Sequence, residues 1–142
     1  MRRGYTFFEL CAALLLAAMA ASALLPAGRD LLDRMAVVAA REAVAGLLAD
    51  ARVAALAHGG ASVHLASGPW RAWAQAGDSA FATVQLERDL AVTVELSRGR
   101  AVTELRYDAL GLGQVASETL RFRRGDAASS LVVSGYGRVR RP

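Results

Sequence analysis

Residues 4–9 read GYTFFE and are followed by an apolar run from Leu10 to Leu25 that stops at Pro26. Together they form a segment of just over twenty residues, about the length that a helix needs to cross a hydrocarbon core of roughly 30 Å. A carboxylate inside such a segment is costly and usually has a partner, so we expect Glu9 to find a cation. The sequence therefore predicts a transmembrane helix over residues 5–26 with one charge near its N-terminal end.

The hexapeptide resembles the class III signal of type IV pilins and type II secretion pseudopilins, in which Gly precedes an aromatic residue, Thr, two large apolar residues, Glu and Leu. In that family a prepilin peptidase cuts after the Gly and methylates the new N-terminus. The resemblance implies cleavage between Gly4 and Tyr5, which makes residues 1–4 a leader peptide. It also implies that Glu9 neutralises the terminal amine of its own or a neighbouring subunit during filament assembly. Pro26 would bend or locally melt the helix, as a proline at this place does in related filaments.

Two alternatives stay open for the N-terminal segment. Ala21-Ser22-Ala23 supplies a small-x-small site after a basic start and an apolar run, which is the pattern of an ordinary secretory signal peptide. The other alternative is a single-span anchor that is not processed. A carboxylate within the apolar region and a helical pattern that continues beyond Pro26 both count against the secretory signal.

Length and composition limit what the remainder of the chain can be. Without the membrane segment about 115 residues remain, which is enough for one small domain. The single cysteine, Cys11, lies inside the apolar helix, so the sequence offers no intramolecular disulfide and no cysteine-based metal site. All seventeen basic residues are Arg, and six of them fall within residues 121–142 against one acid, Asp126. The basic character of the chain therefore lies in this C-terminal segment.

Residues 27–57 keep a helical pattern but alternate apolar with charged positions. Five apolar residues follow one another at spacings of seven, four, three and four, which places them on one stripe of a helix. No proline interrupts this segment, and His58-Gly59-Gly60 supplies a stop signal. We therefore expect an amphipathic helix whose stripe packs on a domain. The stripe consists of Val37, Val44, Leu48, Ala51 and Ala55.

After Gly60 the helical spacing gives way to short alternating stretches separated by glycine-rich turns. Residues 66–80 are the expected loop territory, with Trp70 and Trp73 as core or interface anchors. One long helix followed by several short strands predicts an α+β fold, in which an antiparallel sheet formed by residues 61–142 lies against the exposed half of the helix. The expected strands lie near residues 63–65, 81–87, 90–96, 102–107, 119–123 and 131–133.

The C-terminal half carries five short features, which are Leu105-Arg106-Tyr107, the turn with Gly111 and Gly113, Thr119-Leu120-Arg121-Phe122, Leu131-Val132-Val133-Ser134 and Gly137-Arg138-Val139-Arg140. In these features it resembles the GspH/FimT group of pilin-like proteins, which contains the H-type minor pseudopilins of type II secretion and the FimT-like minor pilins. This resemblance implies a pilin-like fold, with a long N-terminal helix that is half transmembrane and packs against a C-terminal antiparallel sheet domain.

No arrangement of residues in the sequence predicts an active site. His58 and His64 flank a turn, and without a nearby cysteine or paired carboxylate they lack metal-ligand spacing. A Gly-x-Ser-x-Gly elbow and a complete dinucleotide fingerprint are both missing from the sequence. We interpret the two histidines as solvated loop or edge-strand residues, and we expect a protein that is not an enzyme and uses neither a cofactor nor a metal.

The ending GRVRR at residues 137–141 allows two interpretations. Alternate residues of an extended segment share a face, so Arg138 and Arg140 would point the same way and Val139 toward the core. Guanidinium groups match phosphate oxygens, and some FimT-like pilins are linked to DNA capture through a Gly-Arg-x-Arg ending of this kind. In the other interpretation the arginines form a solvated edge that prevents aggregation, or pair with acids of a neighbouring subunit. The candidate DNA-binding residues are Gly137, Arg138, Arg140 and Arg141, with help from Arg121, Arg123 or Arg124.

Taken together, these features predict a minor pilin or pseudopilin. The chain would lie in the bacterial inner membrane as a single-pass protein, with residues 27–142 as a periplasmic domain and Arg2-Arg3 on the inner side. Its partners would be prepilin peptidase and the other pilins or pseudopilins of a type II secretion or type IV pilus filament. The alternative is a DNA-binding minor pilin that takes up DNA through its arginine ending.

Overall fold

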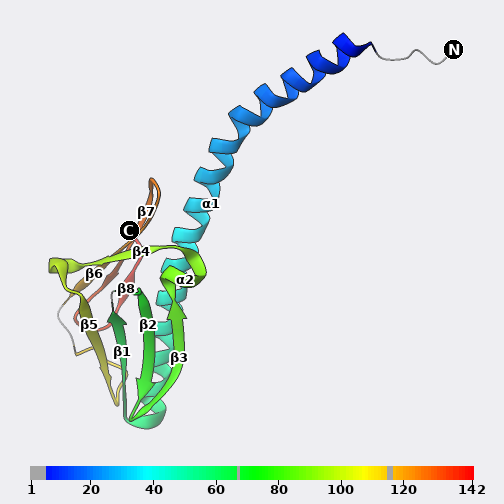
Figure 1. The fold of residues 1–142 in the computed structure, drawn as a ribbon. Helices are drawn as coiled ribbons and strands as arrows, with labels where there is room; N and C mark the ends of the chain where they lie inside the picture. Colours follow the sequence, from blue (N-terminus) through cyan, green and yellow to red (C-terminus); the bar gives the residue numbers. More distant parts are fainter. Residues whose placement is uncertain (1–5, 67, 115–116) are drawn as a thin grey trace. The chain divides into compact units, whose positions relative to one another are not determined.

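The structure is a computed structural model that describes residues 6–66, 68–114 and 117–142. It divides into two compact units, Met1–Leu32 and Asp33–Pro142. Helix α1 (Phe7–His58) supplies residues to both units. In the described part of the chain, the second unit also contains eight strands, the short helix α2 (Leu86–Leu90) and the 3-10 turn η1 (Ser97–Gly99) (Figure 1).

In the first unit, α1 is an apolar helix whose described side chains are exposed to solvent. Phe8, for example, is 81% exposed. By length and composition, this part of α1 can cross a membrane. The helix continues through Pro26, so the loosening that the sequence suggests at this proline stays a prediction.

In the second unit, α1 buries one stripe, as the sequence predicted. The helix ends at His58, where Gly59 adopts the left-handed conformation (φ +81°) that glycine favours just after a helix. Five of the nine buried residues are alanine, and the stripe packs into the core shared with the strands. The buried residues are Ala36, Val37, Ala40, Val44, Ala45, Leu47, Leu48, Ala51 and Ala55.

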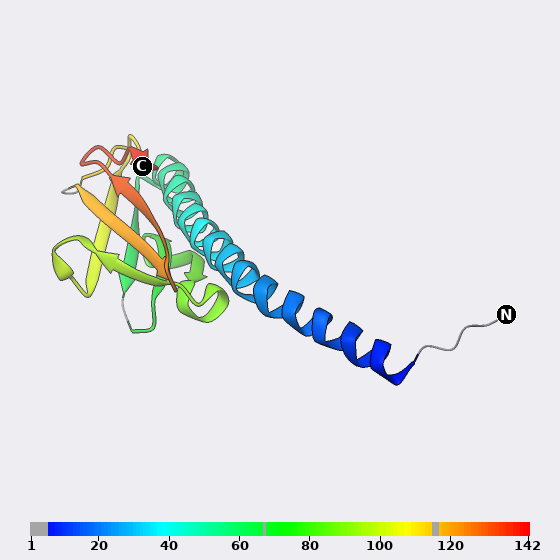
Figure 2. The same cartoon turned by 90° about the horizontal axis from the view of Figure 1, so that it is seen from above.

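The strands form two antiparallel sheets, where the sequence predicted one. The first sheet has the order β3-β2-β1-β5, and the second has the order β4-β6-β7-β8. Figures 1 and 2 show the C-terminal part of α1 running alongside these strands. The first sheet consists of β1 (Gly60–Ala66), β2 (Arg71–Ala76), β3 (Ser79–Gln85) and β5 (Val102–Asp108). The second sheet consists of β4 (Thr93–Leu96), β6 (Glu118–Arg124), β7 (Ala127–Val133) and β8 (Val139–Arg140).

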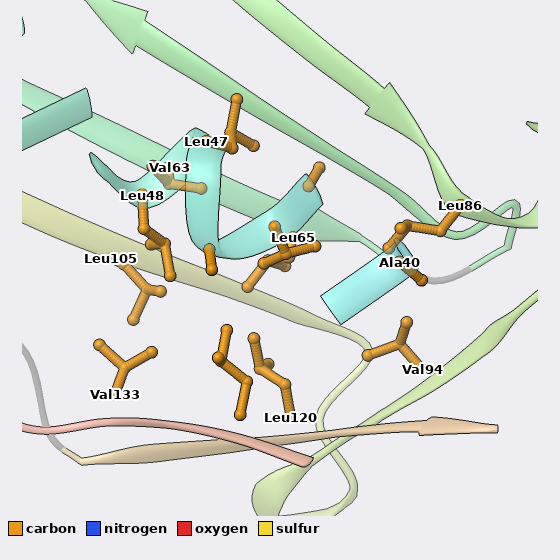
Figure 3. Packing of buried hydrophobic residues seen from close by; sticks show 14 of the residues in the cluster. Ala40, Leu47, Leu48, Val63, Leu65, Leu86, Val94, Leu105, Leu120 and Val133 are labelled. Atoms are coloured by element: carbon orange, nitrogen blue, oxygen red, sulfur yellow. The ribbon is translucent and has the colours of Figure 1, made fainter. Parts of the chain in front are cut away.

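Both sheets and the helix contribute to one hydrophobic core. Figure 3 shows Leu48 of α1, Leu105 of β5 and Val133 of β7 directed into the same space. Leu65 of β1 and Leu120 of β6 face each other nearby in the same view. All five side chains are almost completely buried. The predicted α+β class, with a long helix packed against antiparallel strands, is therefore confirmed.

Two local predictions were wrong. Residues 66–80 contain strand β2, whose inward residues Ala72 and Ala74 are small while the large Trp73 lies on the other face, which weakens the usual contrast between apolar and polar faces. Leu90 does not belong to a strand, because residues 86–90 form α2 and strand β4 begins at Thr93. A helix of five residues is too short to show a helical period in the sequence.

The buried carboxylate of Glu118 connects the β4–β5 turn to strand β6 through a hydrogen bond and an ion pair. Glu118 is 1% exposed, and its Oε1 accepts a hydrogen bond of 2.5 Å from the Ser97 hydroxyl. Its Oε2 pairs with the Arg100 guanidinium, whose side chain is 40% exposed. The two partners come from η1 and the residue that follows it, so the ion pair ties this turn to β6.

We predict that the Arg100→Gln change destabilises the protein more than Glu118→Gln. Removing the arginine leaves a buried charge without its cation, at a cost of about 3 kcal/mol. A glutamine at position 118 leaves only a neutral buried group to satisfy and costs about 1–2 kcal/mol. Urea unfolding of the full chain in a non-ionic detergent, followed by near-UV circular dichroism, measures both values.

Arg106→Gln is the matched control, because Arg106 pairs with Glu104 at 2.8 Å on an exposed part of the first sheet and should contribute little. If Arg100→Gln destabilises the protein no more than this control, the Glu118 ion pair does not hold the turn.

Candidate functional site

The predicted arginine ending lies in a turn and a short strand, and we call residues 137–142 the arginine tail. The turn is closed by Ser134, whose backbone N–H donates to the Arg138 carbonyl at 2.9 Å and whose hydroxyl accepts from the Arg138 N–H at 3.1 Å. The Gly137 N–H donates to the Ser134 carbonyl at 2.8 Å. Beyond the turn, β8 pairs with β7 through Val139 opposite Val133 and Arg140 opposite Val132. These backbone hydrogen bonds and the strand pairing therefore hold the backbone of the tail in place.

Gly137 is required by both its conformation and its surroundings. Its φ of +77° lies in the left-handed region. A Cβ at this position would lie 2.6 Å from Tyr107 Cε1 and 3.3 Å from Gly113 Cα. The backbone at Gly113 is close as well, because its N–H donates to the Tyr136 carbonyl at 3.2 Å. The role of Gly137 is thus to bring the arginine tail against Tyr107.

A groove of about 520 Å³ lies between the arginine tail and α1. Val139 packs against the hydrophobic core, while Arg138 and Arg140 are exposed and both line the groove. The groove is lined by four arginines, Arg52, Arg138, Arg140 and Arg141, together with Ala45, Leu48, Ala49, Tyr107, Gly137 and Val139.

Arg52 is a groove residue that the sequence analysis missed. It lies on α1, four residues after Leu48, and packs against the turn at Gly111, where a Cβ would come within 3.2 Å of Arg52 Cγ. Burial raises the pKa of the Tyr107 hydroxyl, and the positive charge of Arg52 partly opposes this rise. Helical spacing places Arg52 beside the buried stripe, but nothing local in the sequence indicates that the arginine tail lies opposite.

Arg141 lines the groove but is already paired. Its Nη2 lies 3.0 Å from Glu42 Oε2, and its Nε donates to both oxygens of Glu42, at 3.0 and 3.1 Å. Glu42 also accepts from Nη2 of Arg41 at 2.9 Å. The hydrogen bond from Arg141 is the largest cause of the lowered pKa of Glu42. In contrast, neither Arg138 nor Arg140 forms an ion pair with any residue that the structure describes.

The other arginines of the C-terminal segment do not join the groove. Arg124 pairs with Asp33 at 2.8 Å and donates to the Leu90 carbonyl at 2.8 Å, which joins β6 to α1 and α2. Arg121 and Arg123 line a separate, smaller hollow of about 280 Å³ on the second sheet. The structure therefore brings three of the six predicted arginines to one place and assigns Arg124 a structural contact.

At the N-terminal end, Glu9 caps its own helix. Its Oε2 accepts from the Thr6 backbone N–H at 2.8 Å and from the Thr6 hydroxyl at 3.0 Å. The Thr6 hydroxyl in turn accepts from the Glu9 N–H at 3.3 Å. This is a capping box of the form Thr-x-x-Glu, a local signal that the sequence analysis overlooked. The predicted processing residues Gly4 and Tyr5 lie outside the described residues.

The histidines show no metal-binding arrangement in the described part of the chain. His58 is the exposed last residue of α1. His64 was expected in a loop or on an edge strand, but it lies on β1 between β2 and β5, because the missed strand β2 covers that edge. Its ring stacks on Trp73 at 5.0 Å, and Arg71 lies over the same indole at 5.0 Å. These contacts give His64 a structural role on the outer face of the first sheet.

No protein-family profile matches the chain, and no curated protein matches it either. Among solved structures, the chain is similar to the type IV minor pilin FimU of Pseudomonas aeruginosa, with a TM-score of 0.56. The similarity covers 73% of this chain and 90% of that chain at 16% sequence identity. At this identity the comparison establishes a pilin-like fold.

We predict that Gly137→Ala destabilises the chain more than Gly77→Ala. Both glycines have positive φ, so both substitutions carry a backbone cost of about 1–2 kcal/mol. Only at Gly137 would the new methyl group also collide with Tyr107, which adds about 1–3 kcal/mol, whereas nothing lies within 4 Å of a Cβ at Gly77. Urea unfolding of the two variants compares them. Equal losses of stability would contradict the close contact between Gly137 and Tyr107.

Proposed function

We propose that this chain is a minor pilin or pseudopilin, a structural subunit of a type IV pilus or type II secretion filament or of its tip complex. The observation that carries the proposal is the first-unit part of α1, which is apolar and has exposed side chains wherever they are described, joined to a compact unit with a pilin-like fold. An exposed apolar helix of this length needs lipid or other helices around it. In a subunit that is stored in a membrane and then packed into a filament, lipid surrounds this helix first and the helices of other subunits surround it later. This role is structural, with no catalytic step and no cofactor.

The face of α1 that points away from the core supports the same role. Within the second unit this face carries exposed apolar residues, of which Val53 is 66% exposed. Such residues on a helix in water favour burial against a neighbouring molecule. Other pilins or pseudopilins of the same filament are the partners that the proposal assigns to this face. The exposed apolar residues are Met35, Val38, Val53 and Leu56.

Processing and location complete the proposal. Prepilin peptidase would remove residues 1–4 by cutting between Gly4 and Tyr5, and would methylate the new terminus. Residues 5–26 would span the bacterial inner membrane and later lie in the filament core, with residues 27–142 in the periplasm. The arginines at positions 2 and 3 favour this orientation, because basic residues concentrate on the cytoplasmic side.

The charge of Glu9 can be separated from its capping hydrogen bonds. We predict that Glu9→Gln, which retains a capping side chain, weakens incorporation into filaments or tip complexes as much as Glu9→Leu does. Thr6→Ala removes the cap and keeps the charge, so it should leave assembly nearly unchanged. Crosslinking to partner pilins, together with co-purification, measures incorporation. If Thr6→Ala impairs assembly and Glu9→Gln does not, Glu9 serves the helix end instead of a neighbouring amine.

A second candidate function, DNA binding for uptake, is favoured by the groove. Arg138 and Arg140 are exposed, line the same groove and have no ion-pair partner among the described residues. Guanidinium groups held in this way can contact successive phosphates of a nucleic acid backbone. Gly137 would serve this function by positioning the turn, whereas Arg141 lines the groove but is paired with Glu42.

We predict that the full chain in a non-ionic detergent binds a short mixed-sequence DNA duplex. The slope of log affinity against log salt should be about −0.9 for each phosphate contacted. Replacing Arg138 and Arg140 together with Gln should make this slope shallower by about two units. Fluorescence anisotropy titrations at several salt concentrations measure it.

The matched control replaces Arg34 and Arg88 with Gln, because both are exposed and lie outside the groove. This control should leave the slope nearly unchanged. Absence of binding at low salt, or an unchanged slope after the Arg138 and Arg140 replacements, would exclude DNA binding by the arginine tail.

A further inference from the structure

The groove holds four arginines, but they are not equivalent. Arg138 and Arg140 come from the arginine tail and have no carboxylate partner among the described residues, whereas Arg141 is held by Glu42 through two nitrogens. Arg52 comes from the opposite wall, on α1. The number of cations that an anion meets in the groove therefore depends on whether Glu42 holds Arg141 and on the presence of Arg52.

The contact between Glu42 and Arg141 is open to solvent, with side-chain exposures of 43% and 50%. Arg141 nevertheless contacts both oxygens of Glu42 through Nε and Nη2, and this bidentate geometry is the one in which an exposed pair holds. Glu42 also receives Arg41, which donates to the Ser129 hydroxyl of β7 at 3.2 Å. Through these two contacts Arg41 keeps the Glu42 carboxylate close to the second sheet. The carboxylate therefore stays within reach of the Arg141 guanidinium. This arrangement makes Glu42 a competitor for any phosphate that approaches Arg141.

Arg52 is better placed for an anion than a solvated surface arginine. Its aliphatic stem packs on the Gly111 turn, close enough that a Cβ at Gly111 would lie 3.2 Å from Cγ and 3.4 Å from Nε. The contact limits the freedom of the side chain, so less conformational entropy is lost when the guanidinium binds a ligand. No described carboxylate forms an ion pair with Arg52.

We propose that the phosphate-binding set of the groove is Arg52, Arg138 and Arg140, and that Glu42 withholds Arg141 and so limits the affinity for a polyanion. This proposal rests on the DNA-binding function above, and extends it by one contact residue from the helix and one acidic residue that opposes binding. In the arginine tail, Arg138 and Arg140 contact phosphate, whereas Arg141 stays paired with Glu42.

Salt titrations of the full chain in a non-ionic detergent, with the same DNA duplex, test the proposal. Arg52→Gln should make the salt slope shallower by about one unit, as expected for one lost phosphate contact. Arg52→Met, which keeps the stem packed on Gly111, should give the same result. Arg88→Gln, which removes an exposed arginine from α2, is the control and should leave the slope unchanged.

A double-mutant cycle tests the role of Glu42. Arg141→Gln alone should change little, and Glu42→Gln alone should tighten binding and steepen the slope by about one unit, because Arg141 becomes a fourth contact. In the double variant this gain should disappear. Asp89→Asn removes an acid from α2 and is the control for a general change of net charge.

The outcomes distinguish DNA binding by the arginine tail from the specific roles of Arg52 and Glu42. A gain from Glu42→Gln that persists without Arg141 overturns the proposal, because Glu42 then acts only through its charge. The proposal also fails, while DNA binding by the tail stands, if the slope responds to Arg138 and Arg140 but not to Arg52 and Glu42. If neither the native chain nor Glu42→Gln binds DNA at low salt, the DNA-binding function and the proposal are both wrong.

Discussion

The structure depends on the contact between the alanine-rich stripe of α1 and the two sheets. Ala40, Ala51 and Ala55 are fully buried in the core that the helix shares with both sheets. Larger residues of both sheets, such as Leu105 and Leu120, fill the remaining space. Because the contact uses only one stripe, the rest of the helix surface remains available to other partners.

The candidate groove is a consequence of this contact. One wall is the same helix, with Leu48 from the buried stripe and Arg52 beside it, and the other is the arginine tail, which Gly137 brings against Tyr107. The sign and spacing of the charges in the groove are therefore fixed by how the helix packs on the sheets. In our account the groove side of α1 meets an anion, and exposed apolar residues such as Val53 meet a neighbouring subunit.

Much of the fold could be predicted from the sequence, because the apolar stripe of α1 and several strands show clear periods. The division into two sheets could not be predicted, because strand pairing depends on contacts between distant residues. β2 was missed because small alanines face inward and Trp73 lies on the outer face. In the groove, the arginine tail stands out by its composition, but the contact between Glu42 and Arg141 joins residues 99 positions apart and leaves no local signal. The Thr6–Glu9 capping box, in contrast, is a local pattern that could have been recognised.

The central claim is that the apolar helix stays attached to the pilin-like unit after processing. The most direct test is the intact mass of the full chain extracted from membranes of cells with and without a prepilin peptidase. The account predicts a mature chain that begins at Tyr5 and carries a methyl group when the peptidase is present, and an uncut chain when it is absent. A mature chain that begins after Ala23, or a mass that does not respond to the peptidase, would contradict it.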